Sequence, residues 1–87
     1  MLAVKTAYSK VPHFIIKPLS EEDLLHIFHI ASGIMMARDG YLSGGSFVQS
    51  IVNNDLGGVI NRADSTSESA IKFFVYVRDF VFLNQND

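Results

Sequence analysis

A glycine-rich stretch between Gly40 and Asp64 constrains the fold of this chain more than any other feature, because it separates two long apolar segments. The stretch contains five of the six glycines in the sequence. Glycine reaches positive φ angles that other residues rarely adopt, so clusters of it mark turns and helix ends. The segment Ser43–Ser46 therefore predicts a turn that leads into a new helix.

The segment before the glycine-rich stretch carries the clearest helical pattern. Ser20 stands at a cap position, and acids fill the turn after it, where they suit the positive end of a helix. Apolar residues then recur at three- and four-residue spacing along one face: Leu24, Ile27, Phe28, Ala31, Ile34 and Met35. Arg38 suits a helix C-terminus and Gly40 supplies a stop, so we expect a helix over residues 21–38.

A second apolar stripe runs through the glycine-rich stretch to about Arg62. Its members are Val48, Ile51, Val52, Leu56, Val59 and Ile60. Gly57 and Gly58 interrupt it at a cost of about 1 kcal/mol each relative to alanine. Two outcomes are open: one helix with a weak middle, or two short helices that break near Asn53-Asn54-Asp55. We favour the single helix, because the stripe keeps its phase.

The last apolar segment predicts a third helix over residues 66–82. Asp64 or Ser65 caps it, and Ser65-Thr66-Ser67-Glu68 fits a capping box. β-Branched and aromatic residues are frequent here and favour a strand, but strict alternation is absent and the cap favours a helix. This helix is apolar around most of its circumference, and we expect the polar end at 83–87 to fray.

The first 19 residues lack helical periodicity. Val11-Pro12 and Lys17-Pro18 bias the chain towards extended geometry, and the short apolar run between them has no strand to pair with. We therefore expect an extended N-terminal arm over residues 1–19, anchored on the helices by Phe14 and Ile16. The predicted fold class is all-α: a small three-helix domain over residues 20–87 with this arm laid across it.

Composition and missing motifs narrow the function classes. The 87 residues contain no cysteine, which excludes disulfides and thiolate metal sites, and a net charge of −2 offers no general attraction to nucleic acid. No signal peptide or membrane-spanning run is recognisable, so we expect a cytoplasmic protein that binds no membrane. The basic residues are scattered along the chain, so DNA binding is the weakest of the alternatives.

Motifs for catalysis or metal binding are not recognisable either. His26 and His29 lie three residues apart, but no acid or cysteine stands at a spacing that completes a zinc shell. The serines near the turn are not part of a G-x-S-x-G elbow, and Gly44-Gly45 lacks the Lys-Ser/Thr ending of a phosphate-binding loop. We expect no enzyme activity and no cofactor.

Two sets of residues remain as candidate binding sites. The first is a polar cluster and the glycine turn beside it, made of Gly44, Gly45, Phe47, Asn54, Asp55, Arg62 and Asp64. We favour a structural interpretation of the polar groups, since Asn54 and Asp55 can bond to backbone freed by a helix break. Arg62 can likewise pair with either neighbouring aspartate.

The second set is apolar surface that a small helical domain leaves exposed. We expect three helices to bury only part of the large apolar side chains, which include Met35, Met36, Phe73, Phe74, Tyr76, Phe80 and Phe82. Large exposed apolar patches mark interfaces, so Phe73, Tyr76 and Phe80 are candidate anchors for a partner. The alternative is that the N-terminal arm covers them.

The glycine-rich stretch follows the pattern Gly-x-x-x-Gly-Gly…Asn-Asp-Leu…Ala-Asp, with the matching residues Gly40, Gly44-Gly45, Phe47, Asn54-Asp55-Leu56 and Ala63-Asp64. This pattern resembles the core of small bacteriophage-encoded proteins of unknown function. Leu42-Ser43 stands where that core usually has prolines, and Ser46 is an additional residue before Phe47. The resemblance implies a phage or mobile-element origin and supplies no activity.

These features lead us to expect a helical phage accessory protein that binds a host protein and inhibits it by occlusion. Aromatic and methionine side chains are the expected anchors, with the polar cluster at the rim. Two alternatives stay open. A small anionic ligand such as a nucleotide can bind at the Ser43–Gly45 turn, with Arg62 supplying positive charge, or the chain can self-assemble into an oligomer through its last helix.

Overall fold

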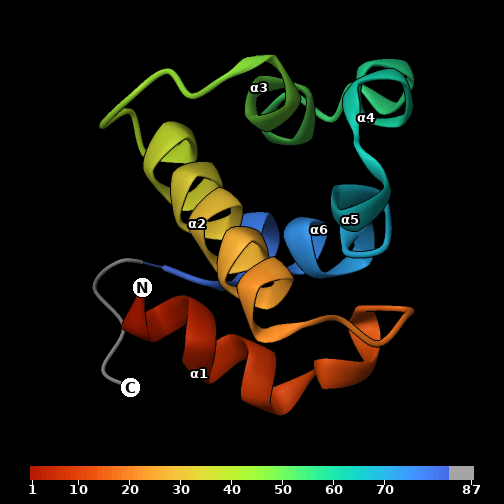
Figure 1. The fold of residues 1–87 in the computed structure, drawn as a ribbon. Helices are drawn as coiled ribbons and strands as arrows, with labels where there is room; N and C mark the ends of the chain where they lie inside the picture. The colour runs from red at the N-terminus through yellow and green to blue at the C-terminus, as the bar shows by residue number, and fades with distance from the viewer. Residues whose placement is uncertain (83–87) are drawn as a thin grey trace.

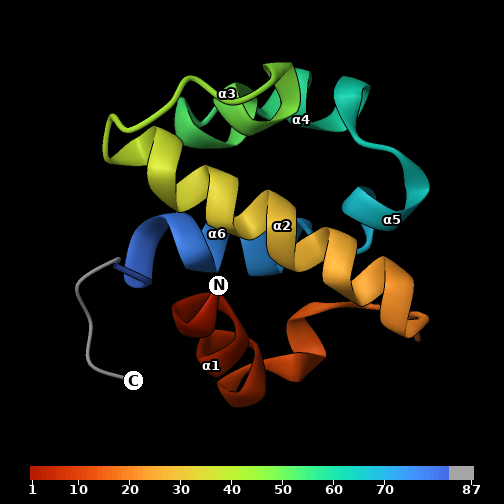
Figure 2. The same cartoon turned by 60° about the vertical axis from the view of Figure 1, so that its left-hand side comes forward.

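The computed structural model describes residues 1–82, and within that range the chain forms helices and no strand, which confirms the all-α class. The elements are α1 (Leu2–Lys10), the 3₁₀ turn η1 (Pro12–Phe14), α2 (Glu21–Arg38), α3 (Ser46–Val52), α4 (Leu56–Arg62), α5 (Ser65–Glu68) and α6 (Ile71–Phe80). Two views show three layers, with α3 and α4 on one side, α2 and α6 in the middle, and α1 on the opposite side (Figure 1, Figure 2).

Helix α2 has the bounds that the sequence predicts. The Ser20 hydroxyl accepts a hydrogen bond from the backbone N–H of Asp23 at 3.1 Å, which confirms the cap. Gly40 has a φ of 84°, as expected of a helix stop. The buried residues of α2 are Ile27, Phe28, Ala31, Ile34 and Met35, all members of the predicted stripe. Local sequence signals therefore determine this element at both ends.

The prediction of an extended N-terminal arm is wrong, because most of that segment is helical. Val4 and Ala7 of α1 lie in the core, with exposed fractions of 0% and 5%. Met1, at the N-cap position, provides no side-chain hydrogen bond to the helix. Helix α1 is therefore stabilised by burial against α2 and α6 and not by local sequence signals. Phe14 packs on Tyr76 as expected, whereas Ile16 is 76% exposed and anchors nothing with its side chain.

The prediction of one continuous second helix is also wrong. The chain breaks between α3 and α4, where Asn54 adopts a φ of 57°. Asparagine tolerates this left-handed conformation better than most residues. The Asp55 carboxylate then accepts a hydrogen bond from the N–H of Gly58 at 3.1 Å and starts α4. A favourable turn and a new cap together outweigh the continuity of the apolar stripe.

The predicted third helix is divided as well, so a three-helix count does not describe this fold. Asp64 caps the short α5 by accepting from the N–H of Ser67 at 2.7 Å. The carbonyl of Ser69 then accepts a hydrogen bond from the backbone N–H of Ile16. This carbonyl is therefore not used in a helix that continues from α5 into α6. Helix α6 ends at Phe80, two residues before the predicted end. The polar end that we expect to fray lies outside the described residues.

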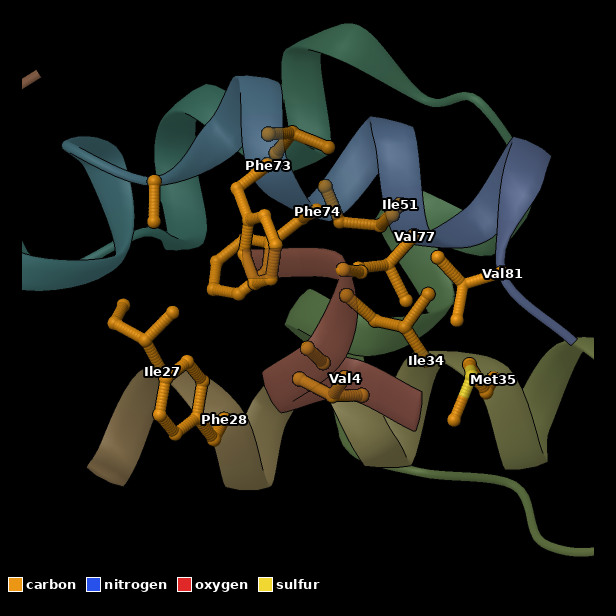
Figure 3. Close-up of a cluster of buried hydrophobic side chains, with 14 residues drawn as sticks. Val4, Ile27, Phe28, Ile34, Met35, Ile51, Phe73, Phe74, Val77 and Val81 are labelled. Carbon is orange, nitrogen blue, oxygen red and sulfur yellow. The ribbon is translucent and has the colours of Figure 1, made fainter. Parts of the chain in front are cut away.

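The core is centred on the facing sides of α2 and α6 and extends to α1 and α3. In Figure 3, side chains of α2 and α6 point towards each other, and Val4 of α1 belongs to the same cluster. Phe73, Phe74 and Met35 are at most 1% exposed. These three side chains are therefore enclosed, and Tyr8 of α1 packs on Phe73. Phe80 and Phe82 are 62% and 44% exposed, so the fold buries only part of the predicted apolar set.

Candidate functional site

The corner between α3 and α4 brings two of the predicted polar residues together. Arg62 Nη1 lies 3.7 Å from the Asp55 carboxylate and donates a hydrogen bond to the Ser50 hydroxyl at 2.6 Å. Ser50 is 3% exposed and donates in turn to the carbonyl of Ser46 at 2.9 Å. The sequence interpretation missed Ser50, although a serine on the apolar side of a helix stripe is a signal for a buried hydrogen bond.

A glycine makes this polar corner compact. Gly58 is buried, and a Cβ atom there would overlap Arg62 Nη1, the Asp55 carboxylate and the Ser50 hydroxyl. The neighbouring Gly57 has open space, with its nearest contact at 3.9 Å from Asp55 Oδ1. The two adjacent glycines therefore differ in role: only the second is required by packing.

The corner surrounds a hollow of about 210 Å³ lined by Ser46, Gln49, Ser50, Asn53, Asp55 and Arg62. Its one cationic group is already paired with a carboxylate and bonded to a hydroxyl. An anion that entered would compete with Asp55 for Arg62. This arrangement supports the structural interpretation of the polar cluster and gives little support to the nucleotide alternative.

The glycine turn before α3 is likewise engaged in local structure. Gly44 has a φ of 67°, and a Cβ there would overlap Val48. Gly45 occupies the N-cap position of α3, and the Gln49 side-chain amide donates to the carbonyl of Ser43. Phe47 packs edge-on against Phe74, with ring centroids 5.7 Å apart. The glycine turn therefore forms the start of α3, and Phe47 packs this helix against the core.

The remaining predicted site residues do not join the corner cluster. Asn54 accepts a hydrogen bond from Arg78 at 3.3 Å. Asp64 caps α5, and the backbone N–H of Ser67 lowers the pKa of its carboxyl, with a smaller contribution from the nearby His26.

The predicted aromatic anchors divide into enclosed and exposed residues. Phe73 is fully enclosed, which removes it from any surface. The rings of Tyr76 and Phe80 are in contact at a tilt of 43°, with centroids 5.4 Å apart, and Phe80 is 62% exposed.

Two arginines tie helices together across the fold. Arg38, at the end of α2, donates to the carbonyls of Val77, Arg78 and Val81 and so caps the C-terminus of α6. Arg78 donates to the carbonyl of Ile51 at 2.8 Å, at the end of α3. A cation at a helix C-terminus is stabilising because the free carbonyls carry partial negative charge.

Each of these arginines is held in place by the aspartate that follows it. Arg38 makes two hydrogen bonds to Asp39, at 2.9 and 2.8 Å, and Arg78 makes two to Asp79, at 2.8 and 3.2 Å. The guanidinium groups lower the pKa of both aspartates, and the Asp79 carboxylate raises the pKa of Arg78. Each of the three arginines in the chain is thus paired with a carboxylate.

A groove with a mainly apolar lining lies between α1 and α2. It encloses a hollow of about 480 Å³ lined by Lys5, Glu21, Glu22, Leu24, Leu25 and Phe28. Leu25 is 45% exposed, while Leu24 is half-buried and Phe28 forms the floor. The sequence interpretation missed this groove because one wall is α1. The acids that signal the start of α2 also form its rim.

A second hollow, of about 450 Å³, shares Glu22 and Leu25 with the groove. Its lining includes Glu22, Asp23, Leu25, His26, His29, Asp64 and Thr66. The two histidines thus share a hollow with three carboxylates. Among residues 1–82, however, no group of three or more histidine or acidic side chains is placed to hold a metal ion.

Comparisons with protein-family models, curated proteins and solved structures find no match to this chain. Within the part of the chain that the structure describes, no helix combines the length and apolar character needed to cross a membrane. The functional conclusion therefore depends on the surface itself.

Proposed function

We propose that this chain is a small phage accessory protein that binds a bacterial host protein and inhibits it by occlusion. The observation that carries the proposal is the groove between α1 and α2, where apolar side chains line a hollow of about 480 Å³. Covering such a groove removes apolar area from water, which is the main driving force of protein association. The phage-like pattern of the glycine-rich stretch supports the phage origin.

The groove replaces two parts of the surface that the sequence suggests, whereas Tyr76 and the exposed Phe80 lie apart from it. Phe73 is enclosed, and the polar corner of Asp55 and Arg62 is bonded internally, so neither offers an anchor. Leu25 projects at the groove with nearly half of its surface exposed, and Leu24 and Phe28 lie beside it. An apolar floor with a charged rim has the composition of a protein-binding surface.

A growth assay combined with co-purification tests this function. The tagged chain is expressed in bacterial cells beside a Leu25→Asp variant, which places a charge at the groove without altering the core. We expect the parent chain to slow growth and to co-purify one host protein in stoichiometric amount, and the variant to do neither. Normal growth and no stoichiometric partner for the parent chain, across several bacterial hosts, would refute the proposal.

A further inference from the structure

Three acidic residues without an ion pair among residues 1–82 lie in the first turn of α2, and two of them, Glu21 and Glu22, line the groove. The third is Asp23. The N-terminus of a helix carries a partial positive charge of about half a unit, which offsets only part of three carboxylates. Lys5 is the one basic side chain that lines this hollow. The rim is therefore electronegative.

The arginines elsewhere do not balance this negative charge. Each is neutralised locally, at the end of α2, in the α3–α4 corner and at the end of α6. The ammonium of Lys72 lies 4.5 Å from the ring centroid of Phe14, outside the groove lining. Because exposed charges beyond a Debye length of about 8 Å are screened, an approaching partner at the groove meets mainly the acids of its rim.

The dimensions of the groove fit a helix. Its α2 wall extends from Glu21 to Phe28, a rise of about 10 Å, which corresponds to roughly two helical turns. A partner helix laid along α2, with Lys5 of α1 bordering the other side, matches this length. Pairing with a partner's strand has no template here, since the described residues contain no strand edge.

On the basis of the proposed function, we infer that the α1–α2 groove binds a basic amphipathic helix of the partner protein. Leucine or aromatic side chains at three- and four-residue spacing enter beside Leu24, Leu25 and Phe28. Lysine or arginine side chains on the flank of the same helix pair with Glu21 and Glu22. The apolar floor supplies affinity, and the acidic rim supplies orientation and a faster encounter.

A fluorescence anisotropy titration tests the groove directly. The probe is a labelled synthetic peptide of about 15 residues, long enough to form a helix on binding, with leucine at helical spacing and lysine elsewhere. One control peptide has the same composition with leucine and lysine alternating, and another has glutamate in place of lysine. We expect saturable binding of the first peptide alone.

Matched variants locate the binding. Replacing Glu21 and Glu22 together by glutamine should lower the affinity for the probe peptide about three- to tenfold, given the usual strength of exposed ion pairs. Leu25→Ser should lower this affinity about tenfold or more, since the substitution removes most of the apolar contact that the leucine makes with the bound peptide. The controls Glu68→Gln on α5 and Ile60→Ser on α4 make the same chemical changes away from the groove and should leave the affinity unchanged.

Equal binding by all variants, or equal binding of the alternating peptide, would overturn the inference. Circular dichroism and thermal unfolding of each variant distinguish lost contacts from lost structure, because acids in a first helical turn also stabilise their own helix.

Site-specific photo-crosslinking in bacterial cells separates this inference from the proposed function. A photoreactive phenylalanine analogue replaces Leu25 in one variant and Ile60 in the other. Crosslinks from position 25 to a basic amphipathic helix support the inference, and crosslinks from there to any other kind of segment overturn it. Crosslinks from position 60 alone refute the groove as the binding site but remain consistent with binding to a host protein. Crosslinks from neither position refute both.

Discussion

The adjacent glycines of α4 give a sharp test of the packing, because alanine should have opposite effects at the two positions. Alanine favours a helix over glycine by about 1 kcal/mol at either position. At the exposed Gly57 the new Cβ meets only Asp55 Oδ1, at 3.9 Å. We therefore expect Gly57→Ala to raise the free energy of unfolding by about 0.5–1 kcal/mol.

At Gly58 the same change meets a filled space. A Cβ there would lie 2.5 Å from both Ser50 Oγ and Asp55 Oδ2, so these side chains and that of Arg62 must move. Overpacking costs about 1–3 kcal/mol, and disturbing the bond from Arg62 to Ser50 adds about 1 kcal/mol. Subtracting the helix preference of about 1 kcal/mol leaves a net loss of about 1–3 kcal/mol.

Urea denaturation of the parent and the two variants measures both changes as shifts of the midpoint at constant slope. In thermal unfolding, 1 kcal/mol corresponds to about 4–8 °C for a domain of this size. A Ser50→Ala background removes one of the overlapped atoms and should recover about 1 kcal/mol of the loss at Gly58. If both alanine variants move stability in the same direction, the corner is not packed as described.

Three further predictions concern the arginine ties, the glycine turn and pH. Replacing Arg38 by methionine should lower the free energy of unfolding in urea by about 3 kcal/mol, because three charge-assisted hydrogen bonds to the end of α6 are lost; a loss below about 1 kcal/mol would contradict the capping role. Gly44→Ala should cost about 1–2 kcal/mol, since φ is 67° there and Val48 fills the space, and circular dichroism with thermal unfolding measures it. The lowered pKa values of Asp39 and Asp79 make stability greatest above the usual aspartate range, and it should fall as pH drops through the lower folded values. Asparagine at both positions should flatten the acid limb of a stability–pH curve, and an unchanged limb would refute this assignment.

The nucleotide alternative also has a direct measurement. Because Arg62 is already engaged, millimolar nucleotide or phosphate should leave the midpoint of thermal unfolding unchanged. A reproducible increase with ligand concentration would revive that alternative.

The sequence by itself determines those elements whose signals are local. Ser20, the acids after it, the apolar stripe and Gly40 specify both ends of α2, and the structure confirms them. Asp64 as a cap and the all-α class are likewise readable from neighbouring residues. In each case the deciding hydrogen bond joins residues within one helical turn, so no distant partner has to be known.

Tertiary contacts decide the remainder. Helix α1 has no side-chain cap and is stabilised by burial of Val4 and Ala7 against helices that come later in the chain. The break before α4 is stabilised by Arg78, which bonds Ile51 and Asn54 from 27 and 24 residues away.

The groove depends on such long-range packing too. Its α2 wall is predictable from sequence, but its α1 wall is not, and a concave surface needs both. Local sequence fixes a helix such as α2, whose cap, apolar stripe and stop all act within a few residues. Helix α1 and the surface between helices depend on contacts that form only when distant segments pack together.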